Sequence, residues 1–337
     1  MHEARLYDRL EDDRIACRVC AHRCTILPGN RGVCGVRENR GGTLYSLTYG
    51  RLISQAVDPI EKKPLFHFYP GSDAFSIASV GCNLHCRFCQ NWEISQMPRD
   101  EGRIAGSEVP AEAVVAAARR YGCRSIAYTY TEPATFFEYA YDTSVLAHAA
   151  GIANVFVTNG YMAADLLEAY HPYLDAANVD LKAFRDEFYR RLCGARLAPV
   201  LDALKLMKRQ GVWLEVTTLI IPGHNDDPGE LADLAGFIAR ELGPGTPWHV
   251  SRFHPAYRLT DAPPTPAATL RRAYDIGREA GLHYVYIGNL PGLRGEDTIC
   301  PHCGQTVIAR YGFTVLERHT RDGTCAYCGT AIEGVGT

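Results

Sequence analysis

The sequence has 337 residues, of which 47% are hydrophobic and 22% are charged, as is typical of a globular protein with one large core. Its formal net charge of −3 gives no electrostatic reason to expect nucleic acid or an anionic membrane as a partner. No apolar run approaches the ~18 residues of a membrane-spanning helix. The charged N-terminal residues do not resemble a signal peptide.

Cysteine is frequent, with 13 residues, and 11 of them fall into three clusters whose spacing is typical of metal ligands. In a chain without an export signal, such clusters indicate metal binding in a reducing cytoplasm rather than disulfides. We therefore expect a cytoplasmic protein. The two cysteines outside the clusters, Cys123 and Cys193, are interpreted as ordinary buried thiols.

Residues 1–75 contain the first cluster and an adjoining loop. The cluster consists of Cys17, Cys20, Cys24 and Cys34, among glycines and prolines that make the segment loop-rich. Such a segment buries little core alone, so a bound metal would stabilise it. The spacing allows zinc or a second iron–sulfur cluster, and the need for a structural link favours zinc.

The stretch 58–68 has two prolines and no clear period. We expect it to be a loop across the mouth of the fold, either as a solvated connector or as part of a substrate site.

From residue 76 to about 290, strand and helix patterns alternate. The predicted strands are 76–80, 124–130, 154–158, 177–182, 213–221, 248–253 and 284–288. The predicted helices are 110–121, 135–150, 162–171, 198–210, 228–242 and 267–281. Repeated units of this length predict parallel strands with right-handed crossovers. Six such units and a final strand fit an α/β fold with an incomplete TIM-like barrel over residues 76–292.

The second cluster, Cys82, Cys86 and Cys89, follows the first predicted strand, where α/β folds place their chemistry. Three thiolates this close together suit a cubane iron–sulfur cluster. Because the loop has no fourth cysteine, one iron would have no local protein ligand and could bind a substrate or cofactor. The three cysteines alone also allow a zinc knuckle or unrelated buried thiols.

This C-x3-C-x2-C loop, with Phe88 before the last cysteine, resembles the signature of the radical S-adenosylmethionine (SAM) enzymes. The resemblance implies a [4Fe-4S] cluster whose open iron chelates the amino and carboxylate groups of SAM. It implies that the reduced cluster cleaves SAM to a 5′-deoxyadenosyl radical. It also implies the partial barrel and an electron donor of the flavodoxin or ferredoxin type.

The end of the second strand resembles the Gly-Gly-Glu-Pro motif of this superfamily, with Tyr130 and Thr131 in place of the glycines. The resemblance implies that Thr131 and Glu132 contact SAM, with Glu132 near its amino group. The residues alone also allow a glutamate that caps a helix beside Pro133.

Later strand ends resemble the pyruvate formate-lyase activating enzymes. Asn159 lies in a Thr-Asn-Gly turn, although Val157 replaces an aspartate that those enzymes link to a cation. Asp180 and Lys182 match a pair that contacts SAM in those enzymes. A carboxylate can accept hydrogen bonds from ribose hydroxyls. The alternative is an ion pair that faces solvent. His254 matches a histidine near SAM, and a structural role is equally open.

The third cluster lies in residues 293–337, after an expected turn at Gly288 to Gly292 and an expected linker over 293–299. Its cysteines are Cys300, Cys303, Cys325 and Cys328. Two C-x2-C pairs, each followed by glycine, predict a zinc ribbon or a rubredoxin-like pair of hairpins. We expect zinc first and a single iron second.

The whole pattern resembles the radical SAM proteins of the AmmeMemoRadiSam system, relatives of the pyruvate formate-lyase activating enzymes. The resemblance rests on both terminal cysteine sets, on the run 91–96 and on the stretch 128–133. It implies partner proteins of the Memo-like and AMMECR types and leaves the substrate undetermined.

Three hypotheses remain. The first is a radical enzyme that abstracts hydrogen from a protein or peptide partner, or from a sizeable metabolite, at the open side of the barrel, with the two cysteine-rich ends flanking that opening. The second is an activase that installs a glycyl radical on a partner. The third is a zinc-ribbon scaffold without catalysis, which would explain both ends but not the motifs at the strand ends.

Overall fold

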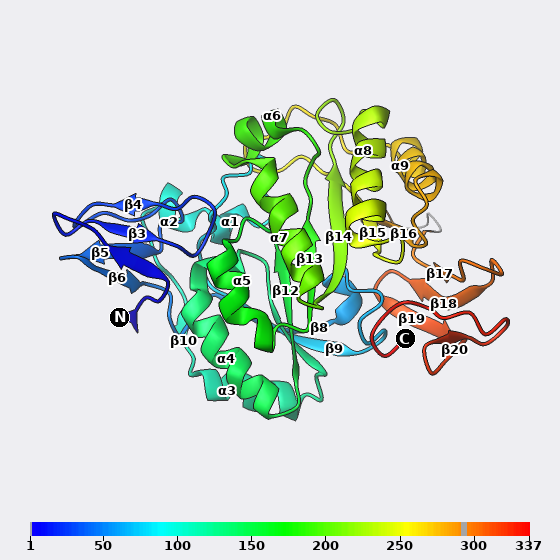
Figure 1. The fold of residues 1–337 in the computed structure, drawn as a ribbon, viewed down its shortest axis with the longest axis horizontal. Coiled ribbons are helices and arrows are strands. Elements are labelled where there is room, and N and C mark those ends of the chain that lie inside the picture. Colours follow the sequence, from blue (N-terminus) through cyan, green and yellow to red (C-terminus); the bar gives the residue numbers. More distant parts are fainter. Residues whose placement is uncertain (1, 291–294) are drawn as a thin grey trace.

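The computed structural model describes residues 2–290 and 295–337, and an eight-stranded sheet forms its centre (Figure 1). The strands are β8 (Ser54–Pro59), β9 (Asp73–Ala78), β11 (Ser125–Tyr128), β12 (Ala153–Thr158), β13 (Ala176–Asp180), β14 (Trp213–Ile220), β15 (Trp248–Arg252) and β16 (Val285–Gly288). Their order is β16-β15-β14-β13-β12-β11-β9-β8. Neighbouring strands are parallel except β8, which is antiparallel to β9. The predicted α/β fold with a parallel sheet is therefore confirmed.

The helices between the strands lie close to their predicted positions. They are α3 (Ala111–Arg120), α4 (Phe137–Ala149), α5 (Ala164–Tyr170), α7 (Leu197–Arg209), α8 (Pro228–Phe237) and α9 (Ala267–Glu279). The parallel strands lie side by side in the order of the sequence. Each right-handed crossover therefore advances the chain in the same direction across the sheet and places its helix on the same face of the sheet. Figure 1 shows α4, α5, α7 and α8 on one side of the sheet. The carboxyl ends of the parallel strands therefore meet at one edge.

Several short helical turns are not indicated by the sequence. They are η1 (Ile60–Lys62), α1 (Trp92–Ser95), α2 (Met97–Asp100), η2 (Pro133–Phe136), η3 (His171–Tyr173), α6 (Asp186–Phe188), η4 (Tyr189–Cys193) and η5 (Ile238–Leu242). They lack the long apolar repeat from which a helix is predicted. Two of them, α1 and η4, lie next to the cysteine loop that follows β9.

The stretch 58–68 is not the loop that the sequence predicts. Its first residues complete β8, and Glu61, Lys63 and His67 are at most 1% exposed. Leu65 packs in a cluster with Ala74 and Ala176, which lie near the beginnings of β9 and β13. The segment is therefore neither a solvated connector nor a loop across the mouth, while a role in a substrate site stays a prediction. The segment is buried against the sheet, near the amino ends of its strands.

A buried carboxylate fixes this segment to the sheet. Glu215 of β14 accepts hydrogen bonds from the backbone N–H groups of Phe66 (2.9 Å) and His67 (2.7 Å). It also bonds Trp213 Nε1 (3.1 Å) and His249 Nε2 (2.7 Å). Burial alone would raise the pKa of Glu215, but the bond to His249 holds it below its usual value. The charge can therefore be buried because each oxygen has partners.

The N-terminal segment forms two small sheets at one end of the molecule (Figure 1). Their strands are β1 (His2–Glu3), β5 (Arg37–Arg40) and β6 (Thr43–Ser46), and β2 (Tyr7–Arg9), β3 (Ile15–Cys17) and β4 (Thr25–Ile26). A further pair joins β7 (Arg51–Leu52) to β10 (Ser107–Glu108). Arg37 forms a buried ion pair with Glu138 of α4 at 2.7 Å. The N-terminal segment is thereby attached to the α4 side of the sheet.

The C-terminal strands lie at the opposite end of the molecule (Figure 1). They are β17 (Thr298–Ile299), β18 (Thr306–Tyr311), β19 (Thr314–Arg318), β20 (Thr320–Arg321) and β21 (Thr324–Cys325). The two cysteine-rich ends therefore lie apart, with the central sheet between them (Figure 1). That they flank one opening stays a prediction. The expected linker ends in β17. Residues 291–294, with Pro291 and Gly292 of the expected turn, lie outside the described residues. No helix in the described ranges is long and apolar enough to cross a membrane.

We expect the change Glu215→Ala to lower the free energy of unfolding by about 3 kcal/mol or more, because it leaves two buried backbone N–H groups and a histidine without their acceptor. Denaturant unfolding of the full-length protein measures this. The control is Glu187→Ala, since Glu187 is 73% exposed and its pair with Arg191 contributes at most about 1 kcal/mol. Equal losses for the two variants would contradict the account of the buried segment.

Candidate functional site

The loop that carries Cys82, Cys86 and Cys89 is held in place by its backbone. It leaves the carboxyl end of β9 through Gly81, whose φ is +99° and where an added Cβ would lie 2.6 Å from Val36. Only glycine fits both constraints. Beyond it, His85 N–H donates to the carbonyl of Cys193 at 2.8 Å, and Arg87 N–H donates to that of Leu192 at 2.8 Å. The thiols are therefore positioned against η4.

Cys82, Cys86 and Cys89 are not among the described residues whose ligand atoms group closely enough to hold a single ion. N–H donors face the sulfur of Cys82, from Leu84 N at 3.4 Å and Asn159 Nδ2 at 3.6 Å. Cys89 Sγ lies 3.2 Å from Ser95 Oγ. Hydrogen bonds of this kind stabilise thiolate sulfur and tune clusters bound to it. The donor set therefore fits a group larger than one ion.

Cys193, which the sequence gave no reason to select, belongs to this site. It is fully buried, and its carbonyl accepts the hydrogen bond from His85 N–H of the cysteine loop at 2.8 Å. Its side chain lowers the pKa of Cys86, whereas burial raises the pKa of Cys193 itself. A separation of more than 100 residues gives no spacing signal, and only the fold brings the two together.

Asp180 and Lys182, at the end of β13, form the expected pair at 2.8 Å. The pair is not simply solvent-facing, because Lys182 is only 13% exposed while Asp180 is 38% exposed. Burial would lower the pKa of Lys182, but Asp180 and the thiols of Cys86 and Cys193 raise it. Its Nζ also lies 6.0 Å from the ring of Phe88, which is buried. A cation is thereby held beside the cysteine loop.

Glu132 is fully buried where β11 ends. Its carboxylate accepts hydrogen bonds from Thr158 Oγ1 (2.9 Å), Asn159 N (2.9 Å) and Ala134 N (3.2 Å). The last of these makes it the N-cap of η2, so the capping interpretation is correct. Burial raises the pKa of Glu132 to about 7 despite these donors. Three donors leave about one of the four lone-pair sites of the carboxylate free for a ligand.

The departure from the glycine motif has a physical explanation. Tyr130 takes the left-handed conformation, with φ of +65°, that glycine adopts at low cost. Its hydroxyl donates to Asp58 at 2.6 Å, and Lys63 Nζ lies 4.5 Å from its ring centroid. Thr131 Oγ1 donates to the carbonyl of Ser79, near the cysteine loop, at 2.7 Å. These contacts hold a backbone shape that would otherwise need glycine.

Asn159 connects the end of β12 to the cysteine loop. Its Nδ2 donates to Asn83 Oδ1 at 2.8 Å as well as to the sulfur of Cys82. Asn83 in turn donates through Nδ2 to the carbonyl of Tyr161 at 3.1 Å. Asn83 carries no motif of its own, so the sequence did not indicate it.

A large pocket opens beside the loop, with an empty volume of about 1510 Å³. Gln90 and the exposed His254 line it, and Gln90 Nε2 donates to the carbonyl of His254 at 3.1 Å. Its other walls come from the buried segment, from β15 and β16, and from the hairpin between β18 and β19. They include Glu61, Phe66, His249, Tyr286, Tyr311 and Phe313. His254 therefore lies at a cavity beside the cysteine loop.

The four C-terminal cysteines form a compact group whose sulfurs all lie within 4.8 Å of one another. Cys300 and Cys328 are 3.7 Å apart, as are Cys303 and Cys325. A tetrahedral ion with metal–sulfur bonds of about 2.3 Å separates its thiolates by about 3.8 Å. The group therefore fits one ion. The four N-terminal cysteines form no such compact group, although all of them line one cavity.

Comparison with known proteins identifies the superfamily. The model of the radical SAM superfamily matches residues 76–235, which run from β9 into α8. A radical SAM methyltransferase from Sphaerobacter thermophilus shares the fold, with a TM-score of 0.52 and 18% identity over 71% of either chain. The protein is a radical SAM enzyme. The scaffold hypothesis, which had no catalysis, is therefore wrong.

Two further relatives extend the comparison. SuiB of Streptococcus suis, solved with S-adenosylmethionine bound, matches with a TM-score of 0.50 and 17% identity over 68% of this radical SAM enzyme and 53% of SuiB. An uncharacterized protein of Methanocaldococcus jannaschii is 48% identical over 335 residues, 99% of either chain. Membership of the superfamily implies a [4Fe-4S] cluster and SAM as cofactors.

We expect the change Cys303→Ser to remove about one metal ion per chain, because a four-thiolate site loses one of its ligands. Elemental analysis of the full-length protein measures this. The control is Cys123→Ser, which removes a buried thiol outside all three cysteine sets and should leave the metal content unchanged. Unchanged metal content in both variants would show that the C-terminal group binds no ion.

Proposed function

We propose that Cys82, Cys86 and Cys89 each bind one iron of the [4Fe-4S] cluster and leave the fourth iron to SAM. The spacing of the three thiols and the N–H donors that face Cys82 support this assignment. When bound, the reduced cluster supplies the electron that cleaves SAM into methionine and a 5′-deoxyadenosyl radical. The loop itself contributes fixed thiolates, held by backbone bonds to η4.

We further propose that SAM lies against the residues that follow β11, β12, β13 and β15 and against Phe88. These residues are Phe88, Thr131, Glu132, Asn159, Asp180, Lys182 and His254. The half-exposed Asp180 has an oxygen available for ribose hydroxyls, while Lys182 offers an ammonium to a carboxylate. Asn159 positions the cysteine loop through Asn83. Charged groups of SAM would find paired partners there in a partly dry site.

The pocket beside the loop supports a large substrate. We propose that the radical abstracts hydrogen from a protein or peptide partner, or from a sizeable metabolite, that enters between β16 and the buried segment. The order of the strands supports this route, because β16 and β8 are the two edges of the sheet. The sheet would then be a partial TIM-like barrel whose opening lies between these two strands. Tyr311 and Phe313 of the C-terminal hairpin line the pocket and are 70% and 47% exposed.

The chain's sequence pattern supports a place in the AmmeMemoRadiSam system, with Memo-like and AMMECR-type partners and a flavodoxin or ferredoxin as electron donor. An activase that installs a glycyl radical is the second candidate, favoured by the Thr-Asn-Gly turn at Asn159. For the C-terminal site we propose zinc in a ribbon-like fold, since its sulfur spacing fits a tetrahedral ion and no redox role is needed.

We expect replacement of Cys82, Cys86 and Cys89 by Ala to abolish 5′-deoxyadenosine formation after reduction, because the irons lose their ligands. The matched control is Cys193→Ser, which removes a thiol that contacts Cys86 but binds no iron in this proposal. It should keep the iron and sulfide content of the wild type. SAM cleavage by the triple variant, or iron loss in the control, would contradict the ligand assignment.

We expect Glu132→Gln to weaken SAM binding about tenfold, since a hydrogen bond to a charged acceptor is worth about 1.4 kcal/mol more than one to a neutral amide. Because the pKa of Glu132 is about 7, the wild type should bind SAM more tightly as the pH rises from about 6 to about 8 and the carboxylate ionises. Titration calorimetry on the anaerobic protein measures both. Equal affinity and equal pH dependence in the two proteins would reduce Glu132 to a helix cap.

A further inference from the structure

The N-terminal cysteines form a site that the function proposed above does not use. Cys17, Cys20, Cys24 and Cys34 all line one cavity with about 340 Å³ of empty volume. They come from the end of β3 and from the loops that connect β3, β4 and β5. Four thiols around one cavity are a complete ligand set for a metal group.

The size of that group follows from a comparison within the molecule. The C-terminal sulfurs lie 3.7 Å apart in pairs, which fits one tetrahedral ion. Among the described residues, neither the N-terminal set nor Cys82, Cys86 and Cys89 forms a compact group of this kind. A cluster spreads its thiolates over several irons and so requires wider spacing. The N-terminal set thus resembles the cysteine loop after β9 rather than the C-terminal site.

A buried arginine supplies a second observation. Arg37 lines the same cavity and is 2% exposed. Its two terminal nitrogens bond Glu138, but its Nε has no hydrogen-bond partner in the ranges that the structure describes. A buried donor of this kind requires an acceptor. Sulfur atoms of a negatively charged group in the cavity would provide one.

We propose that Cys17, Cys20, Cys24 and Cys34 hold a second [4Fe-4S] cluster, rather than the zinc that the loop-rich sequence favours. Each of its four irons takes one protein thiolate, so this cluster has no open iron and cannot chelate SAM. It differs in that respect from the cluster proposed at the loop after β9.

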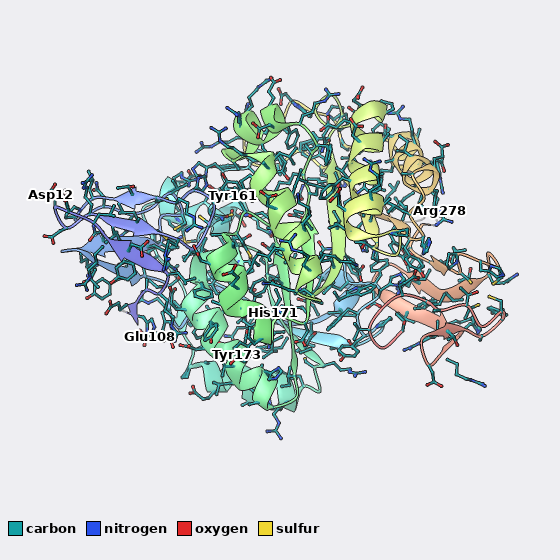
Figure 2. The ribbon with its side chains drawn as sticks, in the orientation of Figure 1. Asp12, Glu108, Tyr161, His171, Tyr173 and Arg278 are labelled. Atoms are coloured by element: carbon teal, nitrogen blue, oxygen red, sulfur yellow. The ribbon has the colours of Figure 1, made fainter. Side chains whose placement is uncertain are left out.

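The two sites are neighbours. Asn83 lines the N-terminal cavity, while its Oδ1 lies 3.8 Å from the sulfur of Cys82. The carbonyl of Cys34 lies 3.3 Å from the position of a Cβ on Gly81. Tyr161, which Figure 2 labels where the N-terminal strands meet the helices, accepts hydrogen bonds through its carbonyl from both Ala21 N and Asn83 Nδ2. A closed cluster in this position is suited to exchange electrons with its neighbour.

The test is metal analysis of the full-length protein, purified and reconstituted without oxygen. The wild type should contain about eight iron, about eight sulfide and about one zinc per chain. The variant in which Cys82, Cys86 and Cys89 are replaced by Ala should retain about four iron and an electron paramagnetic resonance signal after reduction. Addition of SAM should leave that signal unchanged, because the remaining cluster has no open iron.

Wild-type protein with about two zinc and about four iron per chain would overturn this inference and leave the proposed function intact. A SAM-dependent change in the signal of the triple variant would overturn the closed ligation. A second variant, Cys20→Ser, should lose the wild-type contribution of the N-terminal cluster while the other cluster still responds to SAM. Retention of all eight irons with an unchanged spectrum would contradict the ligand set.

Discussion

One buried carboxylate organises the edge of the sheet where the functional groups meet. Glu132 is fully buried, and its oxygens accept hydrogen bonds from Thr158, Asn159 and Ala134. A charge in such a place is tolerated only when donors surround it. It therefore fixes the ends of β11 and β12 relative to each other. Through Asn159, which bonds Asn83 and Cys82, it also fixes the cysteine loop of the neighbouring strand.

The three cysteine sets show how spacing within a fold selects a metal group. Two short hairpins bring the C-terminal thiols to 3.7 Å, the size of one ion. The loop after β9 forms no such compact group in the described residues, and its backbone is bonded to η4 at His85 and Arg87. In our proposals, ligand number separates the other two sets: three thiols would leave an iron open for chemistry, whereas four would close it. The same residue type would thus serve structure, catalysis and electron exchange in the functions that we propose.

The sequence predicted the seven parallel strands, the six helices between them and the cysteine sets, because each depends on local periodicity or spacing. It also placed Glu132, Asn159, Asp180 and Lys182 at neighbouring strand ends. It missed Cys193 and Asn83, whose roles arise from contacts across the fold. It misjudged the stretch 58–68, because Glu61, Lys63 and His67 look like surface residues. They are buried because each has a polar partner: Arg310 for Glu61, Asp58 for Lys63 and Tyr286 for His67.

Direct binding of SAM to an open iron beside Cys82, Cys86 and Cys89 is the central claim of the proposed function. Electron–nuclear double resonance of the reduced cluster, with SAM that carries ¹⁵N in its amino group and ¹⁷O in its carboxylate, tests this contact without a substrate. We predict hyperfine coupling of both labels to the cluster in the wild type. Bound SAM that shows no coupling to a reduced, intact cluster would contradict the central claim.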